Sequence, residues 1–111
     1  MAFDPTGFSI SISDRDGRAV VVIRGELDLA TAPELEAAIQ ARLDEGQDVV
    51  VDLRELAFMD STGLRVLVSA HARVEGTEQR FLIVRPLPGA SIERILAVAG
   101  VEKVLDLVDD A

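Results

Sequence analysis

Two neighbouring stretches of sequence, VVVDL (residues 49–53) and FMDSTGL (residues 58–64), decide how this chain folds. The first stretch is a continuous apolar run, which is typical of a strand that is covered on both faces of its sheet. From Leu64 to Val74 apolar residues return at helical spacing, so this run predicts a helix. Ser61 is therefore expected between a buried strand and the N-terminus of a helix, where backbone N–H groups have no partner within the helix.

A hydroxyl at that position has two interpretations. It can cap the helix, which is worth about 1 kcal/mol. It can also accept a phosphate, because a helix N-terminus attracts anions through its free N–H groups and its dipole. Asp60 offers a further possibility, since its carboxylate could cap the helix and leave Ser61 exposed at the first helical position. The residues around Ser61 leave these alternatives open.

The chain before this stretch predicts a hairpin. Residues 8–13 alternate apolar and polar side chains, which indicates a half-buried strand at a sheet edge. Asp16-Gly17 is a hairpin turn signal, and residues 18–25 form a second, mostly apolar strand. These two strands are expected to pair antiparallel.

A first helix is expected after the hairpin. The sequence from Thr31 to Glu34 has the spacing of a capping box, with Pro33 in the first turn and Gly46 as the stop. Its apolar face consists of Leu35, Ala38, Ile39 and Leu43.

The rest of the chain continues the alternation of helices and strands. The second helix is predicted over residues 61–75, ended by Gly76, and a buried strand over residues 80–84. A third helix over residues 91–99 ends at Gly100, and residues 104–108 predict a short final strand. The expected inward side of the third helix carries Ile92, Ile95, Leu96 and Ala99.

These elements predict an α/β fold in the order β-β-α-β-α-β-α-β. Alternating strands and helices favour a mainly parallel sheet with right-handed crossovers, and the opening hairpin makes the sheet mixed. We expect four to five strands packed against helices. The 111 residues have the length of one domain, so residues 1–111 are expected to form a single domain.

Composition excludes several classes of function. The chain has 11 basic and 20 acidic residues and a formal net charge of -9, which argues against nucleic-acid binding. It has no cysteine, so thiolate chemistry and disulfides are excluded. Residues 1–5 do not have the pattern of a signal peptide, and no apolar run approaches the length of a membrane span. No membrane association and a cytoplasmic location are expected by elimination.

The sequence offers little support for catalysis or a cofactor. His71 lies ten residues from Ser61, about 15 Å along a helix, whereas a nucleophile and its base must be in hydrogen-bond contact. We therefore interpret His71 as a partly buried packing residue. Glu26, Asp28, Asp52 and Asp60 could meet at strand ends, but no metal-binding loop or glycine-rich phosphate loop is present. No metal and no cofactor are predicted.

A family resemblance sharpens the interpretation. The segment DSTGL (residues 60–64), preceded by VVVDL, resembles the STAS domain, and more closely the bacterial anti-sigma-factor antagonists. The segment GELD (residues 25–28), ahead of the first helix, matches a second motif of that family. The closing segment, Ile92 to Val101 with Gly100, is also similar in character to the corresponding segment of the family. The resemblance extends in order over nearly the whole chain.

The resemblance implies a phosphorylation switch at Ser61. In such antagonists the first serine of the motif is the phosphorylated residue. The partner is an anti-sigma factor that is also an ATP-dependent serine kinase, which the unmodified antagonist binds, so that the sigma factor is freed. Phosphorylation releases the antagonist, and a separate phosphoserine phosphatase resets it.

The resemblance also implies a partner-facing surface around Ser61, to which Asp28 and Asp60 would contribute. Thr62 is a possible second phosphoacceptor, and Gly63 either admits a partner backbone or relieves crowding against the sheet. Arg65, one helical turn after Ser61, could pair with a phosphate or remain a solvated charge. The resemblance places Thr31 on this surface as well. Helix initiation is an alternative role for both Asp28 and Thr31, and for Thr31 we prefer it.

Three functional hypotheses follow. The first is the phosphorylatable antagonist, which the short length of the chain favours. The second is a STAS scaffold in a larger signalling or transport assembly, without a phosphorylation cycle at Ser61. The third is a small hydrolase that uses Ser61, which ranks last because a base is missing.

Overall fold

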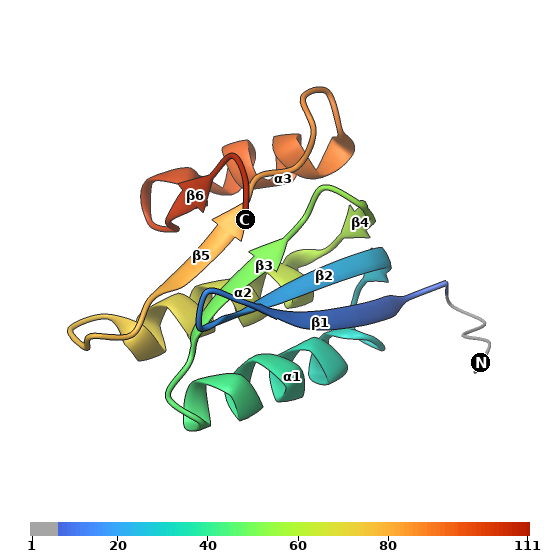
Figure 1. Ribbon diagram of the computed structural model, residues 1–111. Helices are drawn as coiled ribbons and strands as arrows, with labels where there is room; N and C mark the ends of the chain where they lie inside the picture. Colours follow the sequence, from blue (N-terminus) through green and yellow to red (C-terminus); the bar gives the residue numbers. More distant parts are fainter. Residues whose placement is uncertain (1–6) are drawn as a thin grey trace.

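A mixed sheet forms the centre of the molecule (Figure 1). The computed structural model describes residues 7–111, so the interpretation of residues 1–5 lies outside the described part. The elements in chain order are β1 (Ser9–Arg15), β2 (Arg18–Leu27), α1 (Ala32–Asp44), β3 (Asp48–Asp52), β4 (Leu56–Met59), α2 (Ser61–Val74), β5 (Phe81–Val84), α3 (Ser91–Ala99), a 3₁₀ helix (Val101–Lys103) and β6 (Leu107–Val108).

The sheet order is β1-β2-β3-β5-β6, with β4 paired to β2. Strand β1 pairs antiparallel with β2, and all the other pairings are parallel. The predicted α/β class with a mixed, mainly parallel sheet is confirmed. The sheet has six strands rather than the expected four to five, and β4 is the strand that the sequence did not predict.

Strand β4 extends the sheet where β3 ends. The first part of β2 pairs with β3 from Arg18 to Val22, and its last part pairs with β4 from Gly25 to Leu27. A register shift between Gly25 and Glu26 separates the two pairings. Strand β4 therefore carries the chain along β2 to the edge where Ser61 lies.

The predicted hairpin is confirmed. Asp16 and Gly17 connect β1 to β2 with positive φ angles of 54° and 83°, which a two-residue hairpin turn of the primed type requires. Strand β1 is an edge strand, as expected. It is less buried than its alternation predicted: Ile10 is partly buried, while Ile12 is 37 % exposed.

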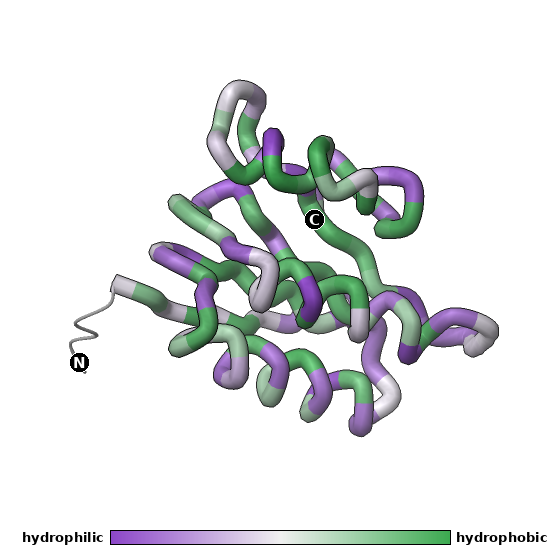
Figure 2. Tube along the Cα trace, turned by 180° about the vertical axis from the view of Figure 1, so that it is seen from behind, coloured by the Kyte–Doolittle hydropathy of each residue, from purple (hydrophilic) through white to green (hydrophobic). Residues whose placement is uncertain are grey.

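Helices α1 and α2 contact each other and pack against strands of the sheet, whereas α3 contacts β4 and the 3₁₀ helix. Figure 2 shows hydrophilic and hydrophobic residues alternating around α1, as expected for a helix with one buried face. On that face Leu35, Ile39 and Leu43 are buried and Ala38 is partly buried. Strand β3 is buried on both faces, as its apolar run predicted.

Two details of the C-terminal part differ from expectation. Ala99, placed on the inward side of α3 from the sequence, is exposed, while Ile92 and Leu96 are buried. The final strand is limited to two residues, because residues 104–106 form an irregular turn after the 3₁₀ helix. Within residues 7–111, no helix has the length and apolar character needed to cross a membrane.

Candidate functional site

The N-terminus of α2 is capped by the residue that precedes Ser61. Asp60 has extended backbone angles, and its Oδ1 accepts hydrogen bonds from the N–H groups of Thr62 at 2.9 Å and Gly63 at 3.0 Å. This is the arrangement of an acidic N-cap, which also places negative charge at the positive end of the helix dipole. Of the alternatives left open by the sequence, the cap is Asp60.

Ser61 is consequently the first helical residue and is exposed to solvent. Among the described residues, no hydrogen bond engages its hydroxyl group, since Asp60 already serves the nearest N–H groups. Thr62 next to it is only partly exposed. The serine hydroxyl is therefore free of a structural task and accessible from outside.

Pairing of β2 with β4 fixes this position. Leu27 and Met59 are register partners, and the N–H of Asp60 donates to the carbonyl of Leu27 over 3.1 Å. Since the two strands are parallel, the residues that follow them, Asp28 and Asp60, lie side by side at the same sheet edge. The predicted proximity of Asp28 to the Ser61 segment is confirmed.

Gly63 allows α2 to sit close to β2. A Cβ atom at this position would lie 2.6 Å from Cγ of Leu27 and 3.1 Å from its carbonyl oxygen, and Gly63 itself is buried. A side chain here would displace the buried Leu27 or lift the helix from the sheet. Of the two roles considered from the sequence, relief of crowding is the one that these distances support.

Thr31 does not form the predicted capping box, so that prediction is wrong. Its side chain makes no cap hydrogen bond to α1. The hydroxyl instead points back toward the end of β2, where it donates to the carbonyl of Glu26 at 2.8 Å and accepts from the N–H of Asp28 at 2.9 Å. Asp28 Oδ1 in turn accepts from the N–H groups of Ala30 and Thr31. Thr31 thus closes the turn that leads into α1.

Two grooves flank the start of α2. The larger, of about 500 Å³, is lined mainly by apolar side chains from β4, α2 and α3, and Ser61 is among its lining residues. Its lining includes Phe58, which is 43 % exposed, and Val98, which is 82 % exposed. The smaller, of about 130 Å³, lies between α1 and α2 and contains Thr62 and Arg65.

The grooves separate residues that the sequence placed together. Ser61 and Leu64 line the larger groove, whereas Thr62 and Arg65 line the smaller one. Residues 58, 94 and 98 were not among the predicted site residues. Val98 is an apolar residue outside the predicted inward side of α3, and this position could have indicated an exposed apolar surface. Only the fold shows that α3 lies against β4.

The strand-end carboxylates do not converge on one point. Asp52, which is buried, forms a forked ion pair with Arg54, with Oδ2 2.7 Å from Nη2 and further bonds to Nε. Burial tends to raise the pKa of Asp52, but the hydrogen bonds and charge of Arg54 outweigh it and hold that pKa below its usual value. Within residues 7–111, no group of three or more acidic or histidine side chains is arranged to hold a metal ion.

His71 lies in the last turn of α2, at the end opposite Ser61. Its side chain is 15 % exposed and its Nε2 lies 3.7 Å from the carboxylate of Glu75. The prediction of a partly buried packing residue agrees with this environment. The histidine and the serine are separated by the length of the helix, so they do not form a nucleophile–base pair.

Fold and site together define a STAS-type α/β protein with a free serine at the head of its central helix. The chain belongs to the STAS domain family: the family model described as "Mlab, STAS domain" matches residues 10–109.

Curated relatives and solved structures agree with this assignment. Anti-sigma-F factor antagonist RsfB of Mycobacterium tuberculosis is 32 % identical over 104 residues, which cover 93 % of this chain and 83 % of the relative. The crystal structure of an anti-sigma factor antagonist from Mycobacterium paratuberculosis superposes with a TM-score of 0.84 at 31 % identity, covering 96 % of this chain and 90 % of the other.

A more distant structure shares the fold. SpoIIAA from Bacillus, solved in its phosphorylated form, superposes with a TM-score of 0.65 at 20 % identity, covering 91 % of this chain and 90 % of that chain.

Proposed function

We propose that this protein is an anti-sigma-factor antagonist that is switched by phosphorylation of Ser61. The observation that carries the proposal is the exposed hydroxyl of Ser61, which is free of hydrogen bonds to the described residues and stands at a helix N-terminus capped by Asp60. The names of the relatives support the antagonist function, and SpoIIAA, which shares the fold, has been solved in a phosphorylated form.

The proposed partner is an anti-sigma factor with serine kinase activity. It would bind the unmodified surface around Ser61, formed by the N-terminus of α2 with Asp28, Asp60, Thr62 and Arg65. Exposed apolar side chains beside the serine, such as Phe58, offer area to bury on binding. Gly63 would support this surface from below, by letting α2 lie close to β2.

Phosphorylation would reverse binding by electrostatics. The kinase would transfer the γ-phosphoryl group of ATP to Oγ of Ser61, releasing ADP and the hydroxyl proton. The phosphate adds about 1.5 to 2 negative charges next to Asp60 and Asp28. The helix N-terminus tolerates this charge, but a partner surface shaped for a neutral serine does not, since an unpaired buried charge costs several kcal/mol.

No refolding is needed for such a switch, because Ser61 has no structural bond to lose. A penalty of about 3 kcal/mol would weaken binding more than a hundredfold. A phosphoserine phosphatase would restore the neutral form. The proposed partners are regulators of transcription, so the proposed place of action is the cytoplasm.

The test uses the purified chain with a cognate anti-sigma factor kinase and ATP. Intact mass and peptide mapping should show one phosphoryl group on Ser61, removable by a phosphatase. Ser61→Ala should bind the kinase and accept no phosphate, and Ser61→Asp should bind more than about a hundredfold more weakly. Ser69→Ala, which changes an exposed serine further along α2, is the matched control and should behave like the wild type. Thr62→Ala should still accept one phosphoryl group on Ser61.

Phosphate on another residue, or Ser61→Asp binding with wild-type affinity, would contradict the proposal. Binding to a signalling or transport assembly with no phosphate ever found at Ser61 would favour the scaffold function instead.

A further inference from the structure

Arg94 on α3 lines the same larger groove as Ser61. The two residues are 33 positions apart in sequence, and they line one groove because α3 packs against β4, the strand that leads into Ser61. Apart from Asp60, Ser61 and Arg94, the lining of this groove is apolar. Arg94 is thus the cationic side chain that the groove presents toward the serine.

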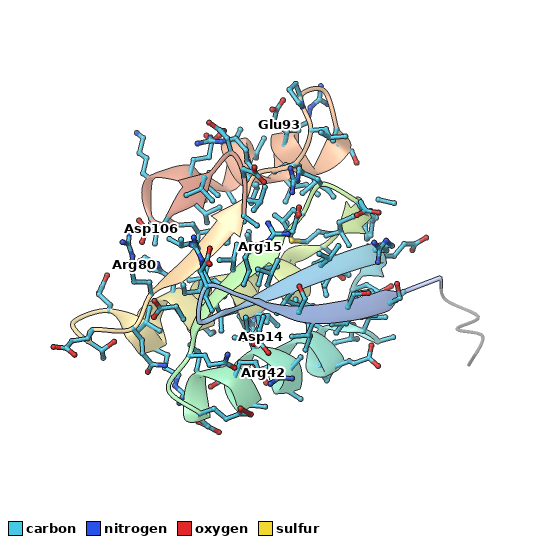
Figure 3. All side chains as sticks on the ribbon, in the orientation of Figure 1. Asp14, Arg15, Arg42, Arg80, Glu93 and Asp106 are labelled. Carbon is cyan, nitrogen blue, oxygen red and sulfur yellow. The ribbon has the colours of Figure 1, made fainter. Side chains whose placement is uncertain are left out.

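The guanidinium group of Arg94 is not occupied by another partner. Within residues 7–111, neither a hydrogen bond nor an ion pair engages it, and the residue is exposed. Its neighbour Glu93, seen on α3 in Figure 3, accepts a hydrogen bond from the N–H of Gly89 at 3.3 Å. The carboxylate of Asp60 is engaged in capping α2. The positive charge of Arg94 therefore remains available to a new anion.

We propose that Arg94 is the intramolecular partner of the phosphate on Ser61, and this inference rests on the proposed phosphorylation. A guanidinium group donates two parallel N–H bonds to phosphate oxygens, which is the strongest pairing a side chain offers to such a group.

Arg65, the residue that the sequence suggested for this role, faces the other side of α2. It lines the smaller groove with Thr62 and Glu36, so its charge lies toward α1. Both arginines are exposed and carry the same charge, and both lie near the start of α2. The geometry assigns the phosphate to Arg94 because Ser61 opens onto the groove that Arg94 lines.

Pairing would tie α3 to the N-terminus of α2 in the phosphorylated state. It would also hold the arginine side chain across the apolar groove, which is open when Ser61 is unmodified. Phosphorylation would then change the shape of the partner-facing surface as well as its charge.

The test installs phosphoserine at position 61 during expression, in the full chain and without a kinase. The pKa of the phosphate is followed by ³¹P NMR in the wild type, in Arg94→Ala and in the matched control Arg65→Ala. A nearby cation stabilises the dianion and lowers the phosphate pKa, normally about 6, so its removal raises that pKa. We expect Arg94→Ala to raise the phosphate pKa by about half a unit or more, and Arg65→Ala by clearly less.

The other charged groups near the phosphate, Asp28, Glu36, Asp60 and Glu93, are the same in both variants. A second readout is thermal unfolding: phosphorylation should raise the melting temperature of the wild type by a few degrees more than that of Arg94→Ala. Arg94→Lys should keep part of both effects, since it retains the charge but loses the fork of donors.

An effect of Arg94→Ala on the phosphate pKa that is equal to or smaller than that of Arg65→Ala would overturn the inference. The kinase assay above is independent of this result. A normal kinase cycle at Ser61 with no special effect of Arg94 would refute only the pairing of Arg94 with the phosphate. Pairing in a chain that no kinase modifies would refute only the proposed function.

Discussion

Two hydroxyl groups at the carboxyl edge of the sheet differ in their hydrogen bonding and in their exposure to solvent. Thr31 and Ser61 each stand at the start of a helix that follows a strand. Thr31 is 7 % exposed, and its hydroxyl bonds both to the carbonyl of Glu26 and to the N–H of Asp28. Ser61 is exposed, and no bond to a described residue holds its hydroxyl.

The placement of one aspartate explains the difference. Asp60 directly precedes Ser61 and takes the N–H groups that the serine could otherwise have capped. Asp28 lies three residues before Thr31, and its Oδ1 accepts hydrogen bonds from the N–H groups of Ala30 and Thr31 within the turn. The hydroxyl of Thr31 remains free to bond to the end of β2. In this fold, the hydrogen bonds of the neighbouring aspartate therefore decide whether the hydroxyl at a helix start has a structural role, as in Thr31, or remains free for modification, as in Ser61.

The largest expected effect that tests this comparison is on stability at Thr31. Thr31→Val keeps the shape of the side chain but leaves the N–H of Asp28 and the carbonyl of Glu26 without their partner. An unsatisfied buried polar group costs about 1–3 kcal/mol, so unfolding in urea should show a loss in this range. Thr31→Ser keeps the hydroxyl and is the matched control.

Ser61→Ala provides the other half of the comparison. Because Ser61 makes no structural bond, its change should leave the free energy of unfolding within about 0.5 kcal/mol of the wild type. A loss at Ser61 as large as that at Thr31 would show that the two hydroxyls are equivalent, which would break the comparison.

A loss of stability smaller than that at Thr31 is expected at Asp60. Asp60→Ala removes the cap of α2 and should cost about 1 kcal/mol in urea unfolding. Asp60→Asn retains a good capping side chain and should stay close to the wild type in stability. If the carboxylate also adds to the repulsion of a phosphorylated surface, the Asn variant should release its kinase partner less completely after phosphorylation, measured by pull-down. Equal stability of the Ala and Asn variants would contradict the capping role.

The sequence predicted the elements with strong periodicity and missed those that depend on distant partners. The apolar run of β3 and the helical spacing after Ser61 sufficed for the buried strand and for α2. Strand β4 was missed because it has four residues, of which two are exposed, and it exists only by pairing with β2.

The same limit applies to the site. Ser61 and Asp60 were found because their roles depend on local order along the chain. Thr31 was misassigned because its spacing to Glu34 also fits a capping box, whereas in the fold its hydroxyl bonds to the carbonyl of Glu26. Arg94 was missed since its closeness to Ser61 comes from the packing of α3 on β4.

The last expected effect depends on pH and concerns Asp52, a buried carboxylate at the end of β3 that is level with Val22 of β2 and away from the edge where Ser61 lies. Its pKa in the folded chain is held below the ordinary value by Arg54, despite burial. A carboxyl group with a lowered pKa stabilises the fold above its unfolded pKa of about 3.9, and this contribution is lost as the pH falls through the folded pKa. Asp52→Asn should therefore be less stable than the wild type at neutral pH, and the difference should shrink below about pH 4.

Urea unfolding between about pH 3 and pH 7 measures this difference. Asp109→Asn is the matched control, because Asp109 also pairs with an arginine, Arg85 at 2.7 Å, but is 88 % exposed, and exposed pairs contribute little. Kinase binding by Asp52→Asn should be unchanged at neutral pH, since Asp52 is buried and paired within its own strand end. A stability difference that does not depend on pH would show that the pair acts through packing rather than through its charge. Asp52 would then differ from an exposed carboxylate such as Asp109 only in its burial. The comparison between a bonded and an unbonded side chain would rest on Thr31 and Ser61 alone.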